Sequence, residues 1–169
     1  MKYPIGIQTF ERIINEGYVY VDKTEMIYNL AHGGSIFFLS RPRRFGKSLL
    51  ISTLKSYFLG HKELFKGLAM EQLEQDWFEY PVFHIDFNNA DFTEAGKLAS
   101  VLKGYVTSWE RIYGKSPDFE DIGNRFAYVL EQAHKQTGRR AVVLIDEYDK
   151  PILDVLDSGY TTQQNGQEI

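Results

Sequence analysis

Residues 35–48 read Ser35-Ile36-Phe37-Phe38-Leu39-Ser40-Arg41-Pro42-Arg43-Arg44-Phe45-Gly46-Lys47-Ser48. Residues 35–40 are a brief apolar run without alternation, which is typical of a strand buried on both faces of a parallel sheet. A helix is predicted from about Lys47. Its apolar stripe consists of Leu50, Leu54, Tyr57 and Phe58. A strand, a loop and a helix in this order provide the framework that a phosphate-binding loop requires.

The loop matches the second half of the P-loop pattern, which is Gly, four residues, Gly-Lys and then Ser or Thr. Gly46-Lys47-Ser48 supplies its end, whereas Arg41 stands where the first glycine is expected. In such a loop the backbone N–H groups hold phosphate oxygens, the lysine bridges the outer phosphates and the hydroxyl binds Mg²⁺. We therefore assign nucleotide contacts to Arg43, Arg44, Phe45, Gly46, Lys47, Ser48 and Leu49. Taken alone, the segment also fits an exposed basic loop.

A second motif follows about a hundred residues later. Residues 141–145 read Ala-Val-Val-Leu-Ile, the clearest buried strand in the chain, and Asp146 and Glu147 follow directly. Ligands of open α/β sheets bind at the carboxyl ends of strands, so Asp146 is predicted to hold Mg²⁺ together with Ser48. Glu147 is predicted to polarise a water aimed at the γ-phosphate, which makes Glu147 and Lys47 the catalytic candidates. The alternative is a strand that ends in solvated acids.

The remaining segments alternate between strand and helix patterns. Residues 82–87 are predicted to form another strand, and periodic apolar residues predict helices over about 98–112 and 119–133. Helix caps are predicted at Asp22 with Glu25, Asp91 with Glu94 and Ser116 with Pro117, and helix ends at Gly33-Gly34 and Gly138. Strands that alternate with amphipathic helices indicate a doubly wound α/β sheet.

Two further acids lie near these motifs. Asp149 precedes Pro151, which fits the first turn of a helix, so we interpret Asp149 as a helix cap in preference to a second metal ligand. Asp86 ends the strand over 82–87 and is interpreted as a turn-forming acid in preference to a pocket residue.

Composition restricts the class of protein. The 169 residues are 43% hydrophobic and 15% aromatic, which is enough apolar surface for a folded domain. A net charge of −4 argues against a domain whose main task is to coat nucleic acid. The absence of cysteine excludes disulfides and thiolate metal sites, and the four histidines have no ligand spacing. Neither a signal sequence nor a membrane-spanning run is present, so we expect a cytoplasmic protein without a membrane partner.

The two motifs together, Phe37 to Ser48 and Leu144 to Pro151, resemble the predicted AAA-ATPase-like family of bacterial proteins. The opening Tyr3-Pro4-Ile5-Gly6-Ile7-Gln8 and the segment Tyr20 to Thr24 are also similar to the lead of that family. The resemblance implies a P-loop NTPase core, with a mostly parallel sheet flanked by helices, that uses ATP and Mg²⁺. It also implies that Arg41 is usual in place of glycine. Members often carry a C-terminal restriction-endonuclease-like nuclease domain.

The chain departs from the family at its end. Members continue into another core strand with a polar sensor residue and into a helical region that can supply an arginine. Residues 158–169 are instead polar, so we expect a disordered tail after a domain over 1–157 that begins with a helical lead. The sheet is accordingly expected to be incomplete at the C-terminus.

The resulting functional expectation is ATP binding with Mg²⁺-dependent hydrolysis. One alternative is a regulatory module that binds nucleotide without turnover, because the sensor strand is missing. A P-loop kinase for a small molecule is a weaker alternative, since the sequence shows neither an acceptor pocket nor a basic lid. Beyond nucleotide, the partners considered are a second copy of the chain and nucleic acid bound through a nuclease domain outside this chain.

Overall fold

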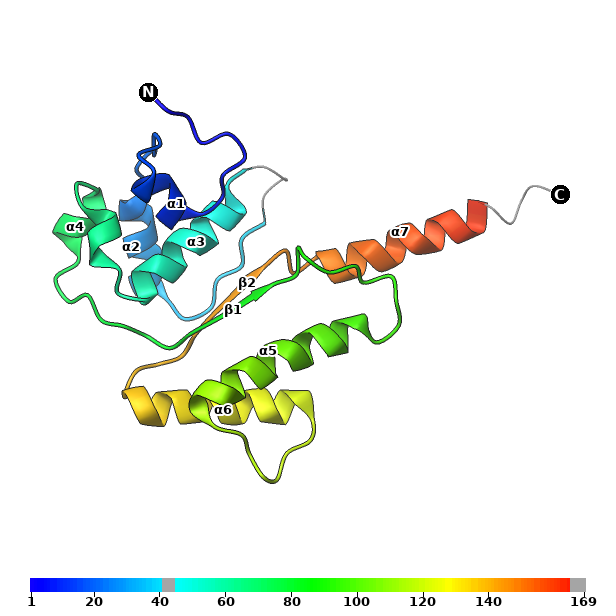
Figure 1. Cartoon of the computed structure of the whole chain (residues 1–169). Coiled ribbons are helices and arrows are strands. Elements are labelled where there is room, and N and C mark those ends of the chain that lie inside the picture. The colour runs from blue at the N-terminus through cyan, green and yellow to red at the C-terminus, as the bar shows by residue number, and fades with distance from the viewer. Residues whose placement is uncertain (41–44, 165–169) are drawn as a thin grey trace. The chain divides into compact units, whose positions relative to one another are not determined.

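The computed structural model describes residues 1–40 and 45–164, with side chains described as far as residue 157. The chain divides into two compact units, Met1–Val82 and Phe83–Ile169 (Figure 1). Arg41, Pro42, Arg43 and Arg44, within the predicted phosphate loop, lie outside the described residues.

The first unit is built from helices. These are α1 (Phe10–Asn15), α2 (Thr24–Gly33), α3 (Lys47–Phe58), the 3₁₀ helix η1 (Lys62–Phe65) and α4 (Ala69–Leu73). Its buried apolar side chains are Phe10, Ile13, Ile27, Leu54, Tyr57, Leu64, Phe65 and Met70. Aromatic rings contribute much of this core, and the ring centroids of Phe10 and Phe65 lie 4.9 Å apart. The helical apolar spacing predicted for α1 and α3 therefore corresponds to faces that are buried inside this unit.

The start of α2 does not use the predicted capping box. Its N-cap residue is Lys23, whereas Asp22 Oδ1 accepts the Thr24 N–H (2.8 Å). Asp22 Oδ2 accepts the Ala69 N–H (2.7 Å), and Thr24 Oγ1 accepts the Met70 N–H (3.0 Å). Because these bonds satisfy the first amides of α4, the Asp22 carboxylate joins two helices and does not cap its own.

The second unit contains the sheet. Its elements are β1 (Val82–Asp86), α5 (Lys97–Tyr113), α6 (Ile122–Thr137), β2 (Val142–Asp146) and α7 (Lys150–Gln164). β1 pairs with β2 in a small parallel sheet, and α5 and α6 form the crossover between the two strands. Both strands were predicted from their apolar runs. The fold is thus mixed α/β, with two strands among the described residues instead of a doubly wound sheet.

The core of this unit lies between β1 and the two crossover helices. Phe83 on β1 is fully buried, and its ring centroid lies 5.0 Å from that of Trp109 on α5. Trp109 in turn lies 5.5 Å from the ring of Phe126 on α6. Figure 1 shows α5 and α6 running side by side. The alternate residues of β1 therefore pack against the apolar stripes of α5 and α6.

The prediction of a strand over residues 35–40 is wrong for this structure. These residues form no strand, and Ile36 and Phe38 are 93% and 72% exposed. An apolar run becomes a buried strand only when neighbouring strands satisfy its backbone groups. In the portion of the chain that is described, the sheet consists of β1 and β2, and residues 35–40 are not one of its strands.

Two other predicted helix starts are also wrong. α5 begins at Lys97, after the left-handed Gly96, because Asp91 Oδ1 instead accepts the Thr93 N–H (3.0 Å) in a local turn. α6 begins at Ile122, and its cap is Asp121, which accepts the Asn124 N–H. The predicted helix ends at Gly34 and Gly138 are confirmed.

The last helix extends beyond the predicted domain boundary. The backbone of α7 is helical as far as Gln164, so it continues into the segment over 158–169 that was expected to be disordered. Residues 165–169 are outside the described range, and the boundary at residue 157 stays a prediction. None of the helices in the described ranges combines the length and apolar character needed to cross a bilayer.

Candidate functional site

Gly46 begins the helix that carries the predicted phosphate contacts. It is the N-cap of α3 and adopts the left-handed conformation, with φ 76° and ψ 21°. Lys47, Ser48 and Leu49 follow in the first turn and are half-buried, whereas Phe45 is exposed. The first N–H groups of a helix have no acceptor within it, and the helix dipole favours an anion there. The local structure thus places Lys47 and Ser48 where a phosphate can be bound.

The other end of α3 is fixed in the core of its unit. Leu54 and Tyr57 are buried, and Ser52 Oγ accepts the Phe10 N–H from α1 (2.9 Å). Thr53 is fully buried and donates its hydroxyl to the Leu49 carbonyl (2.8 Å). The apolar stripe therefore anchors the C-terminal half of α3 in the core, whereas the residues of its first turn are only half-buried.

We expect Gly46→Ala to destabilise the start of α3 by about 1–2 kcal/mol, because a left-handed conformation costs an L-residue that amount. A Cβ at this position would have no heavy atom within 4 Å, so the cost is conformational and not steric. Gly46→Asn should cost less, since asparagine tolerates this conformation. Urea unfolding measures the free energy of unfolding of the wild-type chain and of both variants. A Gly46→Ala variant as stable as wild type would contradict a left-handed Gly46.

The acidic motif ends β2. Asp146 is 8% exposed, and its carbonyl accepts the Phe87 N–H (3.3 Å) from the segment that follows β1. Asp146 Oδ1 accepts the backbone N–H of Glu147 (3.0 Å). The Glu147 carbonyl then accepts the Lys150 N–H (3.0 Å), which closes the turn into α7. Both predicted acids are therefore held in a hydrogen-bonded turn at the carboxyl end of a strand.

Glu147 has an unusual backbone. Its φ is 52°, and among the described residues it is the one non-glycine residue with a positive φ. Such a conformation costs about 1–3 kcal/mol and persists only where the surrounding structure imposes it. Strain of this kind is concentrated at functional sites, which makes Glu147 the strongest catalytic candidate of the second unit.

Asp149 and Asp86 differ in what their carboxylates contact. Asp86 Oδ1 accepts the Asn88 N–H (2.8 Å), which supports its interpretation as a turn-forming acid. Asp149 precedes α7, and its carbonyl accepts the N–H of Leu153. Its Oδ1 atom, however, is buried and has no hydrogen-bond partner in the described structure. Burying a carboxylate oxygen without a partner is costly, so this atom is a candidate ligand for a cation or an ordered water.

The residues present fit a Mg²⁺ ion in part. The described residues contain no group of three or more acidic or histidine side chains arranged to hold a metal by themselves. Mg²⁺ commonly uses one or two carboxylates and takes its other ligands from water and substrate phosphates. Asp146 and the unpartnered oxygen of Asp149, three residues apart in the sequence, are donors of this hard kind. Nucleotide-dependent binding of Mg²⁺ is compatible with this donor set.

One set of contacts beside the acidic turn was not predicted from the sequence. Lys150 Nζ donates to the Ala90 carbonyl (2.7 Å) and to Asp154 Oδ2 (2.6 Å), and Asp154 Oδ2 also accepts the Phe92 N–H (3.1 Å). We call these contacts the Lys150 clamp. The bond from Lys150, and then that from Phe92, lowers the pKa of Asp154 below its usual range. The i,i+4 spacing of Lys150 and Asp154 is visible in the sequence, but their contact with residues 90 and 92 is not.

Comparison with known proteins identifies the family. Residues 4–168 match the family described as "Predicted AAA-ATPase". The chain belongs to this family. It is also 44% identical over 158 residues to the "Uncharacterized protein in vnfD 5'region" of Azotobacter chroococcum mcd 1. That match covers 92% of this chain but 30% of the relative. No solved structure matches the chain.

The match to the AAA-ATPase-like family covers both motifs, but the two motifs belong to different units of the fold. Lys47 and Ser48 belong to Met1–Val82, whereas Asp146 and Glu147 belong to Phe83–Ile169. α3 begins at Lys47 and β2 ends at Asp146 as predicted, whereas the strand predicted over residues 35–40 does not form. A single site that combines the two halves stays a prediction.

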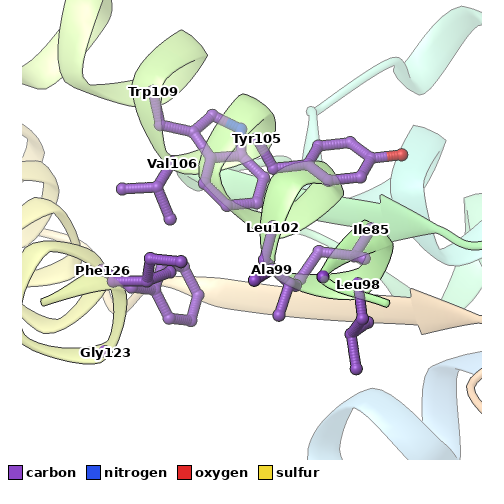
Figure 2. A pocket seen from close by; sticks show the side chains of 11 residues that line it. Ile85, Leu98, Ala99, Leu102, Tyr105, Val106, Trp109, Gly123 and Phe126 are labelled. Carbon is purple, nitrogen blue, oxygen red and sulfur yellow. The ribbon is translucent and has the colours of Figure 1, made fainter. Parts of the chain in front are cut away.

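An apolar hollow in the second unit is a different feature. It measures about 560 Å³ and is open between β1 and the helices α5 and α6 (Figure 2). Its walls include Ile85, Leu102, Val106, Trp109 and Phe126. The Tyr105 hydroxyl, also at this wall, donates to the Asp86 carbonyl (3.0 Å). Because a triphosphate requires N–H donors and cations, this lining does not suit the phosphates of the nucleotide expected for the family.

Proposed function

We propose that the chain binds ATP with Mg²⁺ and hydrolyses the γ-phosphate. The observation that carries the proposal is the left-handed Gly46, which starts α3 with Lys47 and Ser48 in its first turn. That arrangement puts free backbone N–H groups, a lysine and a serine in the first turn of one helix, which is the set of groups that a phosphate-binding helix start uses. Membership of a family described as predicted AAA-ATPase supports a nucleotide as the anion.

The proposed roles follow from the chemistry of each group. Lys47 neutralises charge on the outer phosphates, and the amides of Gly46 to Leu49 hold phosphate oxygens. Ser48 and Asp146 are the proposed ligands of Mg²⁺, which when bound neutralises charge on the phosphates. Arg43 and Arg44 are proposed as further phosphate contacts.

Glu147 is proposed to orient and deprotonate the attacking water. Glu147 is half-buried at the end of β2, and its main chain is fixed on both sides by hydrogen bonds. A fixed general base contributes about 10²–10⁴-fold to a rate. Hydrolysis, as distinct from binding, therefore depends mainly on this residue.

The second candidate function is a nucleotide-binding module without turnover. It requires only the phosphate contacts proposed at the start of α3, and all of these lie within one unit. The chain also spans 30% of the length of its relative, so partners such as a second copy or nucleic acid belong to the proposal for the whole protein.

ATP binding is tested with Lys47→Ala. We expect the variant to lose about 10- to 150-fold in affinity, since a charge-assisted bond to phosphate is worth about 1.5–3 kcal/mol. Isothermal titration calorimetry with ATP and Mg²⁺ measures the change. Lys55→Ala, which alters the last turn of the same helix, is the matched control and should bind as wild type does. Equal ATP affinity in Lys47→Ala would reject the proposed phosphate site.

A further inference from the structure

We propose that Lys150 is a positioning residue that holds Glu147 in its left-handed conformation, an inference that rests on the proposed role of Glu147 in hydrolysis. Glu147 is the joint between β2 and α7, with φ 52°. A conformation of this kind relaxes unless both ends of the turn are fixed. The end toward β2 is fixed by the Asp146 carbonyl, which accepts the Phe87 N–H (3.3 Å).

The other end of the turn is fixed through Lys150. The Lys150 N–H donates to the Glu147 carbonyl (3.0 Å), so any displacement of Lys150 moves the carbonyl of Glu147. The Lys150 side chain donates to the Ala90 carbonyl (2.7 Å) in the segment that follows β1. Since β1 pairs with β2, these bonds close a ring from β2 through the turn and the clamp back to β1. The turn is unable to relax while the ring remains closed.

The two charged side chains of the Lys150 clamp are partly shielded from solvent. The side chains of Lys150 and Asp154 are 27% and 21% exposed, so their bond is better shielded than an ordinary surface pair. Asp154 also accepts the Phe92 N–H (3.1 Å), which adds a second attachment to the segment after β1. The clamp therefore contacts that segment at residues 90 and 92, from two positions one helical turn apart on α7.

A merely structural role for the clamp makes a different prediction. If Lys150 served only to stabilise α7, its loss would lower the stability of the unit without moving Glu147. If Lys150 positions Glu147, its loss lowers the rate constant of the chemical step and leaves ATP affinity unchanged, because the proposed phosphate contacts lie on α3. A split between kcat and ATP affinity distinguishes the two roles.

The experiment compares Lys150→Met and Lys150→Arg with the wild-type chain. Lys103→Met, at an exposed position of α5, is the control for loss of a lysine charge. Three quantities are measured: kcat for γ-phosphate release, the Kd of ATP with Mg²⁺, and the intraresidue HN–Hα nuclear Overhauser effect of Glu147. That effect is strong when φ is positive, so it reports the backbone of Glu147 whether or not ATP is hydrolysed.

We expect Lys150→Met to lower kcat by at least about tenfold, because a displacement of about 1 Å in a reacting group can cost on the order of 100-fold. The Kd of ATP should stay within about twofold of wild type. The intraresidue HN–Hα nuclear Overhauser effect of Glu147 should weaken. Lys150→Arg keeps the donor and the charge and should recover most of the rate. Lys103→Met should match wild type in all three measurements.

An unchanged Glu147 backbone signal in Lys150→Met would overturn the proposal, whatever the rate. An equal loss of ATP affinity and rate would also overturn it. If the wild-type chain neither binds nor hydrolyses ATP, the proposed function fails, while the backbone signal still decides whether Lys150 holds Glu147. Should Lys150→Met not fold, Asp154→Asn removes the charge that Lys150 contacts and is judged by the same three measurements.

Discussion

Glu147→Gln is expected to lower the rate of γ-phosphate release by at least about 100-fold and to leave ATP affinity within about twofold of wild type. Glutamine keeps the size of the side chain but cannot accept a proton from water. The backbone bonds of residue 147, to Asp146 Oδ1 and from the Lys150 N–H, do not involve its side chain and should persist. The variant therefore separates catalysis from binding.

The measurement is single-turnover release of γ-phosphate, together with calorimetric titration of ATP and Mg²⁺. Glu131→Gln is the matched control, because Glu131 lies exposed on α6 in the same unit and pairs only with a neighbouring lysine side chain at 2.6 Å among the contacts described for it. Glu131→Gln should leave both the rate of γ-phosphate release and the ATP affinity unchanged. A Glu147→Gln rate equal to that of wild type would exclude Glu147 as the base. Tight ATP binding without turnover in the wild-type chain would instead favour the regulatory module.

Local patterns predicted the helices well, and for a physical reason. The apolar spacing of α3, α5 and α6 depends on residues three and four apart, so the sequence alone specifies which face is buried. The glycine ends of α2 and α6 were predictable for the same reason, since a glycine ends a helix locally, as the left-handed Gly138 does for α6. The helix starts were less predictable, because Asp91 and Ser116 bind backbone N–H groups two residues ahead and form turns instead of caps.

The strand predicted over residues 35–40 shows what local patterns omit. An apolar run acquires strand structure from neighbours that are distant in the sequence, and its composition does not identify them. The runs of β1 and β2 have the same character, but each has the other as a partner. Pairing, and not hydrophobicity, separates the correct strand predictions from the wrong one.

Some features of the candidate site also follow from local sequence signals, whereas others depend on residues that are distant in the sequence. The position of Lys47 and Ser48 at a helix start follows from a glycine and the apolar stripe behind it, both of which are local signals. The positive φ of Glu147 and the contact of Asp154 with the Phe92 N–H depend on residues about 60 positions away, so no spacing in the sequence indicates them. These are the features from which the role of Lys150 was inferred.

Arg125→Met is expected to destabilise the second unit by about 3–5 kcal/mol, the largest effect on stability that we expect from one substitution. Arg125 on α6 donates through Nε to Glu110 Oε1 (2.8 Å) and through Nη2 to Oε2 (2.7 Å). Both side chains are buried, at 9% and 5% exposure. Removal of the guanidinium leaves the Glu110 carboxylate buried without its cation, which costs more than the pair itself contributes.

A reporter confined to this unit allows the loss to be measured. The chain has two tryptophans, and Trp77 belongs to the first unit. The indole Nε1 of Trp77 has no hydrogen-bond partner among the described contacts, so Trp77→Phe removes no known bond. In that background, the fluorescence of Trp109 during urea unfolding follows the core between β1, α5 and α6. Lys135→Ala breaks an exposed pair with Glu131 and should cost less than about 1 kcal/mol, which makes it the control.

The pH dependence of stability provides an independent check. Arg125 holds the pKa of Glu110 below its usual range, so the folded chain binds a proton there less readily than the unfolded chain does. The pair therefore stabilises the fold fully above the unfolded pKa of about 4.3, and this contribution is lost as the pH falls through the lowered pKa of the folded chain. Glu110→Met combined with Arg125→Met should recover most of the lost stability and should lack this acid-dependent component, because no buried charge remains. A double variant as unstable as Arg125→Met alone would contradict this explanation and would indicate that the packing of the arginine stem, and not the unpaired carboxylate, causes the loss.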